Sequence, residues 1–433
     1  MYVPVRSKFL LALLVAIAWC SFSIWASRFW FEDLSAALHW AVAIYVIGFV
    51  AIVPGFMNAF VVSSLLLDRR PARRRLAQYP PLTILIAAYN ERDSIRETLE
   101  SIRSQHYPAE LEVIVVSDGS TDGTDAVVEE FHRADPRFQC IHRPVNAGKA
   151  AALNLGLSLA SHRLMVTLDA DSLLYGDALL RLVERYFSDP PNTRAVAGTV
   201  LARNSRENWV AKAQEWDYFH GIATTKRIQS LYQGTLVAQG AFSIYHTDTL
   251  REVGGWPQTV GEDIVLTWAL LKRGYRVGYC EDGVVFTIVP STLKAFVRQR
   301  QRWARGMIEA FKAHPSILIT PRLTTFYVWW DLLFPFMDIA YCVFFIPGLI
   351  LALGGNFMIV GPMTLSLLPL SVLINGIMFR VESRMFAKQG LRVRENLLGF
   401  LMYALPYGLV LQPSAVAGYI AEFSGARKFW GTK

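Results

Sequence analysis

Two long stretches without charged side chains, near the start of the chain, constrain its fold more than any other feature. The first lies between Lys8 and Arg28, and the second covers residues 36–67. Because about 20 apolar residues cross a hydrocarbon core of ~30 Å, each stretch is long enough for one membrane-spanning helix. A signal peptide is the alternative for the first stretch, but no small-residue cleavage site precedes Arg28 and the second stretch follows at once. A composition of 53% hydrophobic and 18% charged residues also predicts that part of the chain lies in a membrane.

The charges beside these stretches predict their orientation. Five arginines at residues 69–75 follow the second stretch directly, whereas Glu32 and Asp33 lie between the two. Positive charge collects on the cytoplasmic side of membrane helices, so we expect the chain beyond Arg75 to be cytoplasmic. The cluster could also bind nucleic acid, but its place at a membrane boundary favours the topological role, with some attraction to anionic lipid. We therefore expect a lipid bilayer, and no nucleic acid, as a partner.

The middle of the chain has the composition of a soluble domain. Short β-rich runs at residues 82–88, 111–116 and 164–168 alternate with helical patterns at residues 94–104 and 148–159. This alternation predicts a parallel α/β sheet.

Polar residues follow each of these three predicted strands. Tyr89 and Glu91 come after the first, Asp118 after the second, and Asp169 and Asp171 after the third. Ligands of such sheets bind beyond the carboxyl ends of the strands, so we expect these side chains to meet at one edge. Carboxylates there can hold a base and a ribose, while Asp171 can reach a divalent metal that neutralises a diphosphate. The pattern favours a nucleotide-sugar ligand.

Each of these motifs is weak by itself. Asp-x-Asp occurs by chance in many proteins, and Asp-Gly-Ser at residues 118–120 is more often a plain turn. Lys149 adds a helix amino terminus with a lysine, which suits a phosphate, although a bare turn that caps a helix is the alternative. The order and placement of the motifs carry the interpretation.

Glu262 and Asp263 supply a candidate general base. An aspartate has an ordinary pKa near ~3.9, and burial or the neighbouring Glu262 can raise it toward working pH. Asp263 is therefore our candidate for the carboxylate that takes a proton from an attacking hydroxyl. The pair could instead simply begin a helix over residues 264–272, where acidic side chains favour the helix dipole.

Residues 293–311 predict an amphipathic helix that lies on the membrane surface. Gln299, Arg302 and Trp303 share one face through their i, i+3, i+4 spacing, and we expect this face to point toward the cytoplasmic domain. Arg300 intrudes on the apolar face, where it can snorkel. A solvated basic face with one core tryptophan is the alternative. The apolar face consists of Leu293, Phe296, Val297, Ala304, Met307, Ile308 and Phe311.

Taken in this order, the motifs resemble those of inverting family 2 glycosyltransferases. The resemblance covers roughly residues 81–315 and is to the processive membrane group that contains poly-N-acetylglucosamine, hyaluronan, chitin-oligosaccharide and cellulose synthases. It implies an α/β, Rossmann-like cytoplasmic domain of the GT-A type, inserted between amino- and carboxyl-terminal transmembrane helices. Gly261 stands where many members have threonine, a departure that leaves the proposed base intact.

The resemblance also implies roles for single residues. The residues implied to bind the nucleotide sugar are Asp118, Asp169 and Arg302, of which the last clamps the diphosphate, and Tyr89, Glu91 and Lys149 are further candidates from their places at the strand end and the helix start. Asp171 is implied to bind Mg²⁺ or Mn²⁺, and Asp263 to be the catalytic base. The implied acceptor contacts are Gln299, Gly240 and Trp303, whose ring stacks on the sugar. An aromatic group either lines a polymer path or packs in the core: Trp209, Trp216, Tyr218 and Phe219.

The carboxyl-terminal part is strongly hydrophobic again. A basic loop at residues 380–394 is expected in the cytoplasm, and three full spans would then put the basic tail at residues 427–433 outside, against the positive-inside tendency. Either the last segment, broken by Pro406 and Pro413, is a hairpin, or the short tail ignores the rule. The candidate spans are residues 329–353, 358–378 and 397–420.

These observations predict four regions. They are two membrane helices with a basic loop at residues 1–75, the glycosyltransferase domain at 76–290, the interface helix at 291–320, and further membrane helices at 321–433.

The donor sugar is predicted from three short sequence segments. Residues 146–154, 273–276 and 290–294 most resemble poly-β-1,6-N-acetylglucosamine synthases, although parts of these segments also occur in chitin-oligosaccharide and hyaluronan enzymes. The resemblance implies a processive, multi-pass enzyme of the bacterial inner membrane that transfers N-acetylglucosamine from a UDP-sugar donor to a growing polysaccharide acceptor, for export as a biofilm exopolysaccharide. Alternatives are a synthase of another β-linked polymer, such as a glucan made from UDP-glucose, a non-processive lipid-linked transferase, and a non-catalytic channel or assembly subunit. Because no soluble regulatory domain follows the last hydrophobic segment, we expect control by a second messenger to need a partner, such as a small membrane subunit.

Overall fold

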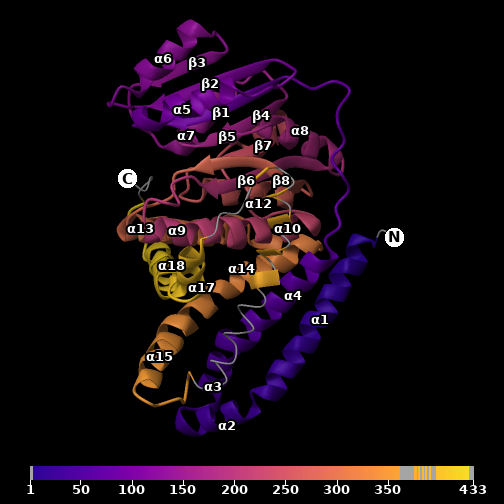
Figure 1. The fold of residues 1–433 in the computed structure, drawn as a ribbon, viewed down its shortest axis with the longest axis vertical. Coiled ribbons are helices and arrows are strands. Elements are labelled where there is room, and N and C mark those ends of the chain that lie inside the picture. Colours follow the sequence, from indigo (N-terminus) through magenta and orange to yellow (C-terminus); the bar gives the residue numbers. More distant parts are fainter. Residues whose placement is uncertain are drawn as a thin grey trace.

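The computed structural model describes residues 3–360, 375–377, 379–380, 383–384, 386–387, 390–391 and 396–428. Figure 1 shows a sheet domain at one end of the long axis, a bundle of apolar helices at the other end, and a layer of helices between them. The arrangement places the middle of the chain beside, and not within, the apolar bundle.

Among the described residues, three helices are long and apolar enough to cross a membrane, or four if a bent pair near the carboxyl terminus counts as one span. They agree with the predicted spans, apart from the one at residues 358–378, which, like much of the predicted loop at 380–394, lies mostly outside the described residues. The first is α1 (Val5–Ala26), followed by the shorter α2 (Arg28–Ala37). The second is continuous through α3 (Trp40–Ile47), η1 (Gly48–Ile52) and α4 (Val53–Leu67), and the third through α14 (Leu323–Ala340), η4 (Tyr341–Phe345) and α15 (Ile346–Leu353).

The sheet has eight strands in the order β3-β2-β1-β4-β7-β6-β8-β5. The prediction of a parallel sheet is correct for β1 to β4, and β6 also runs parallel to β8, but β7 runs antiparallel to both β4 and β6, and β5 runs antiparallel to β8. The strands are β1 (Leu82–Ala88), β2 (Leu111–Asp118), β3 (Phe138–Arg143), β4 (Leu164–Leu168), β5 (Leu173–Tyr175), β6 (Thr193–Ala202), β7 (Phe242–His246) and β8 (Arg276–Thr287).

Hydrophobic cores form on both faces of the sheet, because alternate residues of a buried strand point to opposite sides. Ile84 of β1 packs with Ile95 in one core, whereas its neighbour Leu85 packs with Leu153 in the other. Helices therefore cover both faces and leave the strand ends accessible. The helices of this domain are α5 (Arg92–Arg103), α6 (Thr124–Ala134), α7 (Lys149–Leu159), α8 (Ala178–Ser188), α9 (Trp209–Trp216), η2 (Asp217–Ile222), α10 (Ala223–Leu231), α11 (Thr247–Val253) and α12 (Glu262–Lys272).

The basic linker at residues 68–81 is pinned to the sheet domain. Arg70 pairs with Glu281 at 3.2 Å, and Arg73 pairs with Glu184 at 2.6 Å and with Asp282 at 2.7 Å. We call this set of ion pairs the linker junction. Two of the five arginines that were predicted to orient the chain and attract lipid therefore hold acidic side chains of the domain.

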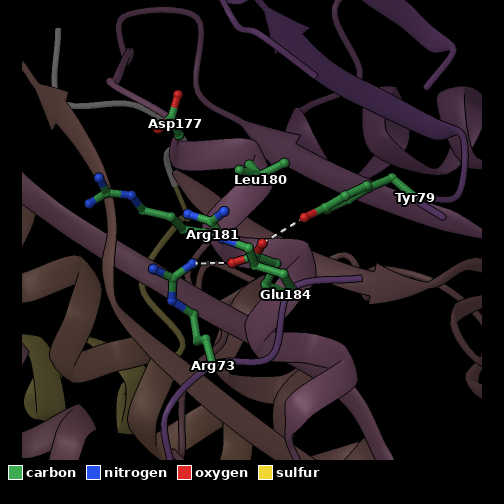
Figure 2. Close-up of a pocket in the computed structure, with 7 residues that line it drawn as sticks. Arg73, Tyr79, Asp177, Leu180, Arg181 and Glu184 are labelled. Atoms are coloured by element: carbon green, nitrogen blue, oxygen red, sulfur yellow. Dashed lines mark hydrogen bonds and ion pairs between the residues drawn. The ribbon is translucent and has the colours of Figure 1, made fainter. Parts of the chain in front are cut away.

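A cavity of about 420 Å³ lies at this junction, between the linker and α8. Figure 2 shows Arg73 and Tyr79 meeting Glu184 in its wall, where the Tyr79 hydroxyl donates to the carboxylate at 2.6 Å. Tyr79 precedes the amino end of β1, so the cavity lies away from the carboxyl ends of the strands, where the predicted site residues are.

The bent pair α17 (Leu397–Ala404) and α18 (Tyr407–Phe423) includes the last predicted span. The two helices meet at 50° beside Pro406. Asn396, just before α17, donates to the backbone of α9 at 3.0 Å, and Lys428, just after α18, pairs with Glu309. Both ends of the pair therefore lie on the side of the sheet domain, so a full crossing that puts residues 427 and 428 on the far side does not describe it.

Candidate active site

The first two polar clusters meet where β1 and β2 end. The side-chain oxygen of Asn90 accepts a hydrogen bond from Thr121 N at 2.8 Å, and Asn90 N donates to Ser120 Oγ at 3.1 Å. Asn90 has a φ of 54°, a left-handed conformation that asparagine tolerates better than most residues. The strand order, in which β1 lies between β2 and β4, explains why clusters far apart in sequence share one edge.

Asp118 holds the turn that precedes α7. Its carboxylate accepts from Gly148 N at 2.7 Å and from Ala147 N at 3.2 Å, and it lies 3.1 Å from the Arg143 guanidinium. With only 1% of the residue exposed, this carboxylate is a fixed part of the edge. Arg143 was not predicted, because nothing in the sequence near it marks it as a partner of Asp118.

Lys149 joins the predicted metal motif to the predicted base motif. Its ammonium lies 2.7 Å from Asp169 and 3.7 Å from Glu262. Burial opposes the charge, but the two carboxylates outweigh it and raise the pKa of Lys149 above its ordinary value. Gly240 lies directly against this ammonium, because a β-carbon at Gly240 would be 2.9 Å from Lys149 Nζ.

Glu262 and Asp263 open α12, as both the functional and the structural interpretation require. Burial raises the pKa of Glu262, Lys149 opposes this rise, and Asp263 adds to it. Asp263 Oδ1 accepts from Ile264 N at 2.8 Å, while its Oδ2 makes no hydrogen bond with a described residue. One oxygen of Asp263 therefore remains for a ligand.

A buried lysine near Asp263 was missed by the sequence analysis. Lys226 is 7% exposed and donates to the carbonyl of Val237. Burial lowers the pKa of Lys226 to about 8, and the charge of Asp263 acts in the opposite direction. Lys226 belongs to no recognisable motif, so only the fold could bring it to this site.

The contact between α12 and the interface helix α13 (Leu293–Ala313) explains the glycine before the acidic pair. A β-carbon on Gly261 would lie 2.4 Å from the α-carbon of Gly306, so the two backbones touch. Glu309, one turn further along α13, accepts from Gly261 N at 2.9 Å. Threonine has no room at this position, and α13 directly positions the start of α12.

Two side chains of α13 have polar groups without a partner among the described residues. Gln299 is 7% exposed, yet its Oε1 has no hydrogen-bond partner among the described residues. Arg302 likewise makes no hydrogen bond or ion pair with any described residue, although it is near enough to Glu262 to lower that pKa. Buried polar groups are normally satisfied, so the Gln299 oxygen is a candidate for a ligand contact, and the partly buried Arg302 is a second candidate because of its charge.

The structure gives the neighbours of α13 and corrects the expected environment of Arg300. The helix packs between α12 and α18. Arg300 does not snorkel, because its guanidinium lies 2.6 Å from Asp217 in a buried ion pair. Trp303 is 37% exposed and faces Tyr218, with ring centroids 6.3 Å apart. Among the other aromatic residues, Trp216 and Phe219 pack in a core, and Trp209 is exposed.

The remaining predicted residues lie at the same edge with varied surroundings. Tyr89 is exposed just beyond β1. Glu91 accepts from Ser94 Oγ at 2.7 Å, so its carboxylate engages the first turn of α5. Asp171 accepts from Thr287 Oγ1 at 3.1 Å.

The candidate metal ligands are sparse. Within the described part of the chain, no group of three or more His, Cys, Asp or Glu side chains could hold an ion. Mg²⁺ usually binds through one or two carboxylates together with phosphate oxygens. Asp169 and Asp171 therefore fit an ion that is shared with a diphosphate, and do not form a site that is complete by itself.

Comparison with known proteins identifies the sheet domain. The family model of glycosyl transferase family 2 matches residues 83–254, which include β1 to β4 and their polar ends. Residues 83–254 therefore match glycosyl transferase family 2. A poly-β-1,6-N-acetyl-D-glucosamine synthase of Staphylococcus epidermidis is 32% identical over 273 residues, which cover 60% of this chain and 65% of the relative.

A further relative and a solved structure are also similar to this chain. An N-acetylglucosaminyltransferase of Rhizobium meliloti is 33% identical over 250 residues, covering 55% of this chain and 58% of the relative. A mannosyltransferase of Pyrobaculum calidifontis, solved with GDP-mannose and Mn²⁺, has a TM-score of 0.61 at 20% identity and covers 92% of this chain and 100% of its own. This likeness shows that the GT-A type fold predicted from the sequence is correct.

Proposed function

We propose that this chain is a processive inverting glycosyltransferase that transfers N-acetylglucosamine from UDP-N-acetylglucosamine to a growing β-1,6-linked polysaccharide. The observation that carries the proposal is the junction at Lys149, where one ammonium lies between Asp169 and Glu262. Asp169 belongs to the predicted donor motif and Glu262 adjoins the predicted base, so Lys149 brings together the groups that would act on the diphosphate and on the acceptor hydroxyl. Similarity to N-acetylglucosamine synthases supports the sugar and the linkage.

The transfer step follows from the groups around this junction. The acceptor hydroxyl oxygen attacks the anomeric carbon as the bond from that carbon to the diphosphate oxygen breaks, which inverts the configuration. Asp263 takes the hydroxyl proton through Oδ2, since Oδ1 is held by the start of α12. Arg302 stabilises the departing diphosphate with its unpaired guanidinium, and UDP leaves.

The other predicted residues receive supporting roles in this proposal. Asp118 fixes the turn at residues 146–148, against which the nucleotide binds. Asp169 and Asp171 hold Mg²⁺ or Mn²⁺, which neutralises diphosphate charge when it is bound. Gln299 and Trp303 contact the acceptor, through an unpaired amide oxygen and a half-exposed ring.

The membrane arrangement supports synthesis on one side and export to the other. The basic linker and the end of α18 both lie at the catalytic domain, and positive residues at both places favour a cytoplasmic domain. The apolar helices below this domain provide the membrane part through which we propose that the polymer leaves.

The test is UDP release by the purified full chain in detergent or nanodiscs. UDP-N-acetylglucosamine, UDP-glucose and UDP-glucuronate are offered in turn with Mg²⁺ or Mn²⁺, and any polymer is digested with a β-1,6-specific hexosaminidase. We expect release with the first donor and a product that this enzyme cuts. Release with another donor alone contradicts the proposed sugar, and an uncut product contradicts the linkage.

A further inference from the structure

A buried polar cluster links three elements beside the acceptor end of the site. The Arg300 guanidinium on α13 donates to Asp217 Oδ2 on η2 at 2.6 Å and to the Tyr407 hydroxyl on α18 at 3.0 Å. The Tyr407 hydroxyl donates in turn to Asp217 Oδ2 at 3.0 Å. We call these three residues the Arg300 cluster. Each of its members contacts the other two, so none can move alone.

The cluster is closed off from solvent. Arg300 is 5% exposed, and Asp217 and Tyr407 are also buried. Breaking a buried ion pair by removing one partner leaves an uncompensated charge, whereas a paired set holds its geometry firmly. The surrounding backbone is also specialised, because Asp217 begins a short π-helical segment, a feature often found at functional sites.

The other side of the Arg300 guanidinium lies against Trp303. The carbon at its centre is 4.2 Å from the centroid of the Trp303 ring, within the range of a cation–π contact. Tyr218, the neighbour of Asp217, faces the same indole with ring centroids 6.3 Å apart. The half-exposed ring of Trp303 thus lies between Arg300, a member of the cluster, and Tyr218, which follows Asp217 in the chain.

Tyr407, the third member of the cluster, lies at the break between α17 and α18. Tyr407 is the first residue of α18 and follows Pro406, where α17 and α18 meet at 50°. The orientation of Trp303 is therefore connected to the angle between α17 and α18 through the contacts of Arg300 with Trp303 and with Tyr407.

We propose that the Arg300 cluster consists of positioning residues that hold Trp303 against the pyranose face of the acceptor sugar and tie this orientation to the break at Pro406. The inference rests on the proposed function, since it needs an acceptor to bind at Trp303. In this proposal Arg300 positions the Trp303 ring, whereas Arg302 contacts the diphosphate.

Conservative variants test this role. Arg300→Lys keeps the charge beside Asp217 but removes the planar group from Trp303, and Tyr407→Phe removes one hydroxyl. Arg305→Lys is the matched control, because Arg305 also joins α13 to α18 through Glu422, at 3.4 Å, without contact to Trp303. UDP release is measured against the concentration of an N-acetylglucosamine oligosaccharide and, separately, against UDP-N-acetylglucosamine.

We expect Arg300→Lys to raise the acceptor KM by about tenfold with the donor KM within twofold of wild type, and Tyr407→Phe to do the same to a smaller extent. In a Trp303→Ala background, Arg300→Lys should add no further rise, because it acts through the ring. Arg305→Lys should leave the acceptor KM unchanged.

Three results overturn the inference. One is an equal rise in donor and acceptor KM for Arg300→Lys, and another is the same acceptor effect in Arg305→Lys. A third is an Arg300→Lys enzyme that matches active wild type at every acceptor concentration, which leaves the proposed function intact. Wild-type protein that releases no UDP with any donor contradicts the proposed function itself, and the inference falls with it.

Discussion

The linker junction and the catalytic edge are both rich in arginine and carboxylate, but they use these charges differently. At the linker junction, Arg70 and Arg73 each pair with acidic side chains of the domain. At the catalytic edge, Arg302 has no partner among the described residues, and Asp263 keeps one oxygen without a hydrogen bond. Paired charges fix two parts of a chain, whereas a charge without a partner near the strand ends remains for a ligand. The linker junction therefore attaches the linker to the sheet domain, whereas the other edge of the same domain keeps charged groups available for a ligand.

The largest effect is expected from removal of the proposed base. Asp263→Asn should reduce UDP release by on the order of 10²- to 10⁴-fold, because the amide cannot accept the hydroxyl proton. UDP binding, measured by calorimetry, should remain. Asp248→Asn on α11 is the matched control, since that carboxylate is exposed and pairs only with Arg251 among the described residues. Unchanged turnover in Asp263→Asn removes this residue from the mechanism.

Removal of the unpaired arginine should come next. A charge-assisted hydrogen bond contributes about 1.5–3 kcal/mol, so Arg302→Ala should slow UDP release by roughly 10- to 100-fold. Because Arg302 holds no described residue, the melting temperature in detergent should stay within about one or two degrees of wild type. A large fall in melting temperature with normal turnover would make Arg302 a structural residue like Arg73.

The pH dependence of turnover should reveal Glu262. Burial raises its pKa, so the acidic fall in kcat/KM should begin at higher pH than the ~4.3 of an ordinary glutamate allows. Protonation removes one of the two carboxylates beside Lys149. The same shift means that Glu262 contributes stability below its ordinary pKa, which is lost as pH rises through the raised value. Glu262→Gln should therefore be slower but lack this acidic limb; an unchanged limb contradicts the assignment.

The smallest effect on turnover is expected at the linker junction. Arg73→Ala leaves Glu184 and Asp282 without their shared partner, so the melting temperature should fall by a few degrees. The donor KM and the turnover of the remaining folded protein should equal those of wild type. Arg74→Ala, an exposed neighbour in the linker, serves as the control for a change of charge alone.

Local sequence patterns were sufficient for the elements that carry their own signal. The strands at residues 82–88 and 164–168 and the helix at 293–311 were predicted within a few residues, because each shows a clear hydrophobic period. The parallel direction failed at β7, since strand direction depends on where the chain re-enters the sheet, and no local pattern records that.

The site was predictable where its residues belong to motifs and not where only packing brings them together. Asp118, Asp169 and Glu262 could be named from spacing, and the fold brings all three around Lys149 or its turn. Lys226 could not, because it belongs to no motif, and the pairing of Arg300 with Asp217 could not, because the two residues lie far apart in sequence. The apolar periodicity of α13 gave the wrong environment for Arg300, since a buried ion pair and a lipid surface produce the same pattern.

The most direct test of the central claim is the affinity of UDP for wild type, Arg302→Ala and Arg73→Ala, each titrated by calorimetry with Mn²⁺, with Mg²⁺ and without a divalent metal. The account predicts metal-strengthened binding in wild type, at least tenfold weaker binding in Arg302→Ala, and wild-type binding in Arg73→Ala. Equal UDP affinity in wild type and Arg302→Ala, or a loss confined to Arg73→Ala, would contradict it.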